Sequence, residues 1–346
     1  MRIPERLNLG FFAVKQPHQA IAFKILLTLF LTGSYSAPVF ATQVVSQTTS
    51  SRQFKSFADW CLKKSTLPAP ARHTVNVLLK RSRTMDCYQS SEVLSNATTL
   101  DLSDSQLSDL SPLQPLTGLT ELYLGNNQIA NLKPLSTLTN LTRLYLSYNQ
   151  ISDLTPLKPL RNLEALYLGN NRISELDSLQ FLTNLISLDL VSNRIANISA
   201  LKSLSKLNSL DLSFNQVANL SPLQSLTSLI ELSLSAQKPT KKVTDLNPLK
   251  TLTDLTTLDL SGNQITDLSP LKSLTNLTNL ALGGNQIANI GSLSTLANLT
   301  TLYLGGNRIR DLSPLKTLAN LNVLYLQDNP LASATCPVKP ETICHF

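Results

Sequence analysis

The most regular chemical feature of this chain is a series of tyrosines and aspartates at one fixed spacing. Tyr123, Tyr145 and Tyr167 follow one another at intervals of 22 residues, and Asp189 and Asp211 continue the series. Tyrosine offers a large contact area at a small entropy cost and is enriched at protein interfaces, while carboxylates attract cationic groups. The spacing therefore predicts a row of binding residues rather than a single reactive centre.

Patterns typical of catalysis or metal binding are absent from the sequence. A serine–histidine–acid set needs a histidine beside its nucleophile, but the only histidines after residue 41 are His73 and His345, which lie outside the repeated part of the chain. The glycines of "LGGNQIANIG" lack a P-loop lysine, and no zinc or calcium spacing occurs. We therefore expect a non-enzymatic protein with no catalytic residues, no metal and no cofactor.

A repeat of 22 residues must position this row. Its pattern is L-x-x-L-x-L-x-x-N-x-I-x-x-L-x-P-L-x-x-L-x-x, and eleven units begin between Ala97 and Leu321, with one four-residue insertion between Leu229 and Leu255. The alternating L-x-L predicts a short strand with its leucines pointing inward, and the later leucines, three apart, suit a 3₁₀ or α turn that proline begins. A period in this range is typical of stacked repeats.

An asparagine stands at the ninth position of nine units, where the chain has to turn. Its amide can satisfy backbone donors and acceptors, so stacked units should form an asparagine ladder. Ser105 replaces it in the first unit. In the seventh unit we expect the insertion "QKPTKK", residues 237–242, to disrupt the ladder with a basic loop, which is either a contact site or a tolerated surface loop.

This repeat resembles the leucine-rich repeat family, in the 22-residue class found in bacterial internalins and in a regulatory subunit of protein phosphatase 1. The resemblance covers residues 97–331. It implies an α/β repeat solenoid, a curved right-handed array with short parallel strands on the concave face and 3₁₀ or short helical turns on the convex face. The flanking segments resemble the cysteine-containing caps of secreted bacterial repeat proteins.

The segments outside the repeats predict a leader and two caps. Residues 1–41 have a basic start, the apolar run "ILLTLFL" and small residues before Ala41, which predicts a secretory signal peptide cleaved after Ala41, with an uncleaved anchor as the alternative. Residues 42–96 are expected to form a linker and a helical N-terminal cap, and residues 332–346 a C-terminal cap. We expect a secreted, periplasmic or cell-envelope protein without stable membrane insertion after cleavage.

Two cysteines lie in each cap. Cys61, Cys87, Cys336 and Cys344 allow three pairings, and free buried thiols are a further alternative. A long rigid array should keep the two ends apart, so the local pairs Cys61–Cys87 and Cys336–Cys344 are favoured. In an oxidising compartment each would contribute about 2–4 kcal/mol by closing a short loop.

The charge distribution disfavours a nucleic-acid partner. The net charge is +7, but residues 97–346 carry 17 basic and 18 acidic side chains, so the basic excess lies before the repeats. The side chains expected on the concave face include nine acids and one base, Arg143. We expect a monomer whose partner is a protein or peptide.

The candidate ligand-binding residues share the expected concave face. They are Tyr123, Arg143, Tyr145, Tyr148, Tyr167, Asp189, Asp211, Asp259, Tyr303 and Tyr325. An alternative role for the tyrosines is packing against each other to stabilise adjacent strands. The sequence favours a secreted, non-enzymatic protein-binding scaffold. The alternatives are an envelope-attached adhesion or glycan-binding protein, and a regulatory subunit of an enzyme such as a phosphatase.

Overall fold

In the computed structural model, which describes residues 54–238 and 242–346, the first leucine of each L-x-L segment is the central residue of a three-residue strand. The central leucine of each strand is buried, as the alternation predicts. The predicted signal peptide, its cleavage site, residues 42–53 and the middle of the insertion lie outside the described residues. The strands are β1 (Thr99–Asp101), β2 (Glu121–Tyr123), β3 (Arg143–Tyr145), β4 (Ala165–Tyr167), β5 (Ser187–Asp189), β6 (Ser209–Asp211), β7 (Glu231–Ser233), β8 (Thr257–Asp259), β9 (Asn279–Ala281), β10 (Thr301–Tyr303), β11 (Val323–Tyr325) and β12 (Cys344–His345).

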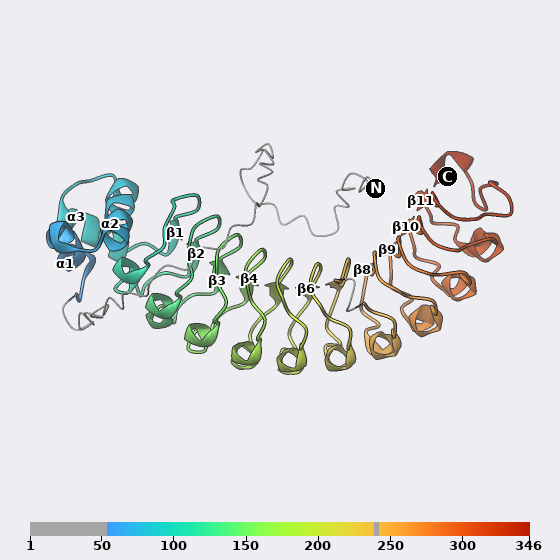
Figure 1. The fold of residues 1–346 in the computed structure, drawn as a ribbon, viewed down its shortest axis with the longest axis horizontal. Helices are drawn as coiled ribbons and strands as arrows, with labels where there is room; N and C mark the ends of the chain where they lie inside the picture. The colour runs from blue at the N-terminus through green and yellow to red at the C-terminus, as the bar shows by residue number, and fades with distance from the viewer. Residues whose placement is uncertain (1–53, 239–241) are drawn as a thin grey trace, which may run out of the picture. The chain divides into compact units, whose positions relative to one another are not determined.

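All these strands pair in parallel and in chain order, within one sheet. Equivalent positions of neighbouring units lie opposite one another, as Leu122, Leu144 and Leu166 do. The buried leucines of successive units belong to one continuous core. Within Phe54–Phe346 taken by itself, the strands line the inner side of the curved stack (Figure 1). The repeat solenoid expected from the sequence is confirmed.

The second half of each unit forms a 3₁₀ turn on the outer side of the stack (Figure 1). Seven of these turns have proline at their first or second position, for example Pro156, where its fixed φ favours the turn and its missing N–H removes no hydrogen bond. The turns are η4 (Ser111–Leu113), η5 (Lys133–Thr137), η6 (Thr155–Leu157), η7 (Asp177–Phe181), η8 (Ser199–Ser203), η9 (Ser221–Ser225), η10 (Asn247–Thr251), η11 (Ser269–Ser273), η12 (Gly291–Thr295) and η13 (Ser313–Thr317).

The ninth-position asparagines form the expected ladder. Asn193 is 4% exposed, and its Oδ1 accepts a hydrogen bond from the N–H of Ile173 at 3.0 Å. Its Nδ2 donates to the carbonyls of Leu168 and Leu190, each at 3.0 Å. One side chain therefore satisfies backbone groups in its own unit and in the unit before it.

The seventh unit keeps the ladder, which corrects the expectation that the insertion disrupts it. Gln237 is 1% exposed, and its Oε1 accepts from the N–H of Val217 at 2.9 Å. Its Nε2 donates to the carbonyls of Leu212 at 2.9 Å and Leu234 at 3.2 Å. Glutamine carries the same amide as asparagine, so it makes the same bonds, and the added residues follow this position.

From residue 54 onward, three α-helices precede the first strand: α1 (Phe57–Leu62), α2 (Ala69–Ser82) and α3 (Cys87–Ser95), with the 3₁₀ turn η3 (Lys64–Thr66) between the first two. Ser56 and Asp59 form a capping box at the start of α1, and the Asp86 carboxylate caps α3. Phe57 and Leu78 are fully buried in the core that continues into the repeats. These helices cover the leucines that the first unit would otherwise expose.

A short C-terminal segment closes the other end. It contains the 3₁₀ turn η14 (Glu341–Ile343) and β12, which pairs with β11. The expected local disulfides are both present: Cys61–Cys87 joins α1 to α3, and Cys336–Cys344 holds β12. No helix in the described ranges is both long enough and apolar enough to cross a bilayer.

Replacing Asn193 with alanine should destabilise the fold by roughly 2–5 kcal/mol. The substitution leaves the buried N–H of Ile173 without a partner, and it removes one of the two amide hydrogen bonds that the Leu168 and Leu190 carbonyls each accept. Chemical denaturation followed by circular dichroism measures this loss. Asn162→Ala is the matched control: Asn162 is exposed and donates one hydrogen bond to the carbonyl of Thr139. Equal destabilisation by the two substitutions would contradict a structural role of the ladder.

Candidate functional site

The tyrosines at the fifth position of units two to four stack into a ladder, which we call the tyrosine ladder: Tyr123, Tyr145 and Tyr167. Their strands are in parallel register, so the three rings lie in line. The ring centroids are 4.3 Å apart for the first pair and 4.6 Å for the second, with nearly parallel planes. All three side chains are half-buried, so each contributes to the stack and keeps a surface open to solvent.

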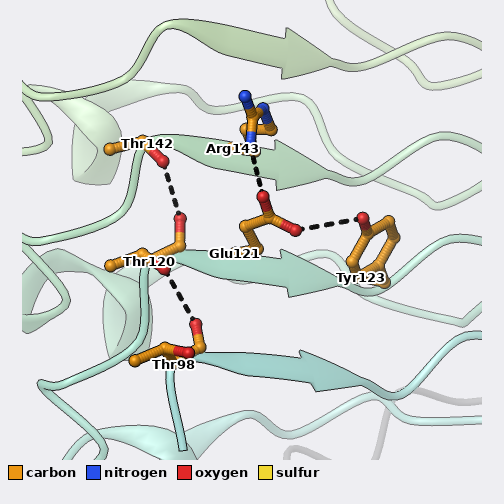
Figure 2. A network of polar contacts seen from close by, with 6 residues as sticks. All are labelled: Thr98, Thr120, Glu121, Tyr123, Thr142 and Arg143. Atoms are coloured by element: carbon orange, nitrogen blue, oxygen red, sulfur yellow. Dashed lines mark hydrogen bonds and ion pairs between the residues drawn. The ribbon is translucent and has the colours of Figure 1, made fainter.

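Charged side chains border this ladder. The Glu121 carboxylate pairs with the Arg143 guanidinium and accepts a hydrogen bond from the Tyr123 hydroxyl at 3.3 Å (Figure 2). The bond to Glu121 raises the pKa of Arg143, and burial followed by the Glu121 charge raises the pKa of Tyr123. Burial, the largest cause, also raises the pKa of Tyr145. Tyr123 and Tyr145 therefore remain neutral near pH 7 and can donate hydrogen bonds.

Threonines hold the strand starts together beside this group. Thr120 donates through its hydroxyl to the Thr98 carbonyl at 3.1 Å, and Thr142 donates to the Thr120 carbonyl at 3.2 Å (Figure 2). These bonds extend the strand pairing and fix the spacing of the side chains that follow. Tyr123 and Arg143 are thus held by the backbone of β2 and β3.

A second aromatic stack lies at the C-terminal end of the sheet. Tyr303 and Tyr325 stack with centroids 4.8 Å apart, and His345 stacks on Tyr325 at 4.5 Å. His345 comes from β12 and continues the column. It pairs with Tyr325 at a separation of 20 residues, two fewer than the repeat length of 22. Periodicity therefore could not reveal this member of the stack.

Between the two stacks lies the aspartate column: Asp189, Asp211 and Asp259. Each carboxylate accepts a hydrogen bond from the backbone N–H two residues later, at 2.8–2.9 Å. Burial raises the pKa of all three, and that of Asp211 reaches about 7. The neighbouring carboxylates raise the pKa of Asp211 further, whereas hydrogen bonds from Ser213 oppose the shift.

The expectation of an exposed acidic centre needs correction at Asp259. Asp259 is buried, with only 8% of its surface exposed. Its neighbours Thr257 and Ser233 are also buried, at 7% and 2% exposed. Residues on the inner face crowd one another, and the carboxylate turns to the N–H of Ser261. Asp189 and Asp211 remain half-buried, so they are the members of the column that a ligand can reach.

A further row follows the strand ends. We define the strand-end row as the eighth residue of each unit, where every described φ is positive: Asp104, Asn126, Tyr148, Asn170, Ser192, Phe214, Ala236, Gly262, Gly284, Gly306 and Asp328. Tyr148 is 61% exposed and Phe214 is 46% exposed. Tyr148 was expected at the site because it lies beside the tyrosines in the sequence pattern. Phe214 was not expected, because it lies three units beyond Tyr148.

The structure therefore divides the candidate residues into three groups on one sheet. Arg143 and Tyr148 lie with the tyrosine ladder over β2 to β4, the aspartates lie on β5, β6 and β8, and the last two tyrosines lie on β10 and β11. No three histidine, cysteine or acidic side chains of the described residues are grouped so that they could hold a metal. The arrangement offers contact area and carboxylates to a ligand.

The repeating strand and 3₁₀ turn, the asparagine ladder and the two caps define a leucine-rich repeat solenoid. The chain belongs to the leucine-rich repeat family and is internalin-like. The family described as "Leucine Rich repeats (2 copies)" matches residues 98–137, 117–159, 139–181, 161–203, 183–225, 227–273, 253–297 and 297–337.

Solved structures similar to this chain come from bacteria and plants. An internalin from Listeria monocytogenes is 33% identical, with a TM-score of 0.64, over 77% of this chain and 86% of that one. The Arabidopsis receptor kinase HAESA, in complex with the peptide hormone IDA and a co-receptor, is 26% identical, with a TM-score of 0.57, over 68% of this chain and 43% of that one. A plant peptide hormone receptor is 25% identical, with a TM-score of 0.55, over 65% and 38%. No curated protein matches the chain.

The raised pKa of Asp211 predicts a stability that falls as pH rises. Between its ordinary value of 3.8 and about 7, the folded chain holds a proton that the unfolded chain has lost, so the free energy of unfolding decreases through this window and then levels off. Asp211→Asn removes the buried charge. The variant should be stabilised by roughly 4 kcal/mol more at about pH 8 than at about pH 4, as measured by urea denaturation.

Asp101→Asn is the matched control for this measurement. Asp101 occupies the same position of the first unit and accepts a hydrogen bond from the N–H of Ser103 at 2.9 Å, but it is exposed. Its replacement should change the free energy of unfolding by no more than about 0.5 kcal/mol at either pH. A pH dependence of Asp211→Asn no greater than that of Asp101→Asn would count against the buried-charge explanation.

Proposed function

We propose that this chain is a secreted, non-enzymatic scaffold that binds a protein or peptide ligand on the face formed by its strands. The observation that carries the proposal is the tyrosine ladder, whose rings stack at 4.3 and 4.6 Å while each side chain stays half exposed. Stacking restrains the rings before a ligand arrives, so little side-chain entropy remains to be lost on binding.

The surroundings of the ladder support the same function. Arg143 is exposed and held by Glu121, so it presents a positioned cation beside the rings. Leucines fill the interior of every unit, so Tyr123, Tyr145 and Tyr167 lie outside the leucine core. Two of the similar structures are plant receptors that share this solenoid architecture: one is a peptide hormone receptor, and the other is in complex with the peptide hormone IDA.

Export to an oxidising compartment is the second part of the proposal. Both cysteine pairs are disulfides, and no cysteine in the chain is free. Disulfides persist in secreted and periplasmic proteins and are rare in the cytosol. The predicted cleavage after Ala41 would leave residues 42–346 as the exported chain.

The cleavage site gives a direct prediction. N-terminal sequencing of the protein recovered from the medium or the periplasm should give Thr42 as the first residue, because Val39 and Ala41 occupy the positions that signal peptidase reads. Recovery of a chain that still begins at residue 1 in the membrane fraction would contradict cleavage and favour an anchor.

Replacing Tyr123, Tyr145 and Tyr167 together with alanine should abolish capture of the ligand. Residues 42–346 and the variant are immobilised and exposed to secreted and cell-surface fractions, and the captured proteins are compared by quantitative mass spectrometry. Capture should fall about tenfold or more, because stacked aromatic residues at the centre of an interface dominate binding energy. Replacing the same three residues with phenylalanine keeps the stack and separates ring area from hydroxyl bonding.

The control removes aromatic side chains from elsewhere on the same protein. Tyr88 in α3 is 68% exposed and Phe181 in η7 is 39% exposed, and neither belongs to the strand face. Tyr88→Ala with Phe181→Ala should leave capture unchanged. Circular dichroism melting of all variants confirms that they are folded. If the ladder variant is folded and captures as well as the control, the proposal is wrong.

A further inference from the structure

Two members of the strand-end row do not suit the backbone conformation that they occupy. Tyr148 has φ 60° and Phe214 has φ 57°, in the left-handed region. That region is unfavourable for bulky side chains and is tolerated by glycine and asparagine. The other members of the row are glycine, asparagine, aspartate, serine or alanine. The fold itself therefore favours a small residue at both positions.

Neither aromatic ring compensates for this cost by packing inside the protein. Tyr148 and Phe214 are 61% and 46% exposed, and neither stacks on another ring of the described residues. Backbone strain that is not offset locally is a feature of functional sites, where a side chain is needed by a ligand. Two exposed aromatics at such positions thus point outward to a partner.

Backbone hydrogen bonds place the two aromatics in one line. The N–H of Tyr148 donates to the Gly169 carbonyl at 2.8 Å, and the N–H groups of Asn170 and Ser192 make the same bond to the next unit at 2.8 and 2.9 Å. Phe214 therefore lies three units beyond Tyr148, roughly 14 Å away at the usual strand spacing of about 4.8 Å. Only the small residues Asn170 and Ser192 stand between them in the row.

Carboxylates lie beside the line from Tyr148 to Phe214. Asp189 and Asp211 end β5 and β6, the two strands that precede Ser192 and Phe214, and both carboxylates are half-buried. Neither is in an ion pair with a described residue. Arg143, the one base of this face, is paired with Glu121. A cationic group of a ligand would complement these carboxylates and replace part of the solvation that burial removes.

We propose that Tyr148 and Phe214 are paired anchors for an extended peptide segment with two apolar side chains and a lysine or arginine between them. The proposal rests on the proposed function and names its ligand class. An extended chain advances about 3.3 Å per residue, so anchors roughly 14 Å apart receive residues i and i+4. Residue i+2 points to the same side and lies between the units of Asn170 and Ser192, where Asp189 is the nearer carboxylate and Asp211 lies one strand further along.

The test replaces each aromatic residue with asparagine, which already occurs at this position of other units. Asn126 and Asn170 occupy the strand-end row with positive φ, so Tyr148→Asn and Phe214→Asn are compatible with the fold. Both variants should raise the denaturation midpoint, because the left-handed strain is relieved. Each should weaken peptide binding about tenfold, because an exposed anchor is lost. A residue with a structural role would instead lower the midpoint when replaced.

The probes are labelled synthetic peptides in fluorescence anisotropy titrations with the exported chain. One has leucine or phenylalanine at i and i+4 and lysine at i+2, and matched peptides carry glutamate at i+2 or move the second apolar residue to i+2. The lysine peptide should bind, and both matched peptides should bind at least about tenfold more weakly. Tyr88→Asn is the control and should leave binding unchanged.

Three results separate this inference from the proposed function. Loss of lysine-peptide binding in both asparagine variants, with higher denaturation midpoints, supports the inference. If no peptide binds, or the variants bind as the unaltered chain does, the paired-anchor inference is overturned. Capture of a ligand that depends on the tyrosine ladder would then still support the proposed function, whereas capture that survives the ladder variant would overturn that function.

Discussion

Every buried backbone group at the turn after each strand needs a hydrogen-bond partner, and this requirement sets the rest of the structure. One side-chain amide per unit supplies the partners: Asn193 joins Ile173 and Leu168 of the preceding unit to Leu190 of its own. Because the bonds cross from unit to unit, they fix not only the turn but the register of neighbouring strands. A unit that shifted by one residue would lose these bonds and turn its leucines outward.

This fixed register turns sequence periodicity into columns of touching side chains. Tyr123, Tyr145 and Tyr167 stack because their strands cannot slide, and the same constraint brings Asp189 beside Asp211. Stacking of tyrosines is favourable, whereas burial of a carboxylate is not. Burial is the main cause of the raised pKa of Asp211, and the adjacent carboxylates add a smaller contribution. The fixed register of the strands is therefore the cause of both columns, and the backbone N–H groups that bond to the carboxylates offset part of the cost of the second.

The features that recur from unit to unit could be predicted from the sequence, whereas departures from the repeat in a single unit or in the C-terminal cap could not. The leucine core, the asparagine ladder, the proline turns and the local disulfides each follow from a pattern that recurs or from the distance between the chain ends. Gln237 was missed because a pattern search seeks asparagine, although the chemistry requires only an amide. β12 and His345 were missed because they pair across 20 residues rather than 22. The burial of Asp259 depends on how tightly its neighbours in space pack around it, and the residue types at one repeat position do not reveal that packing.

The strand-end row separates the demands of folding from those of binding within a single position of the repeat. Folding requires a positive φ at that position, and Gly262, Gly284 and Gly306 meet the requirement without strain in the C-terminal units. Tyr148 and Phe214 meet it at a conformational cost and stay exposed. Since the same backbone accepts glycine three times, the fold gives no reason for an aromatic residue there. This difference between the units is the observation on which the proposed peptide site between Tyr148 and Phe214 rests.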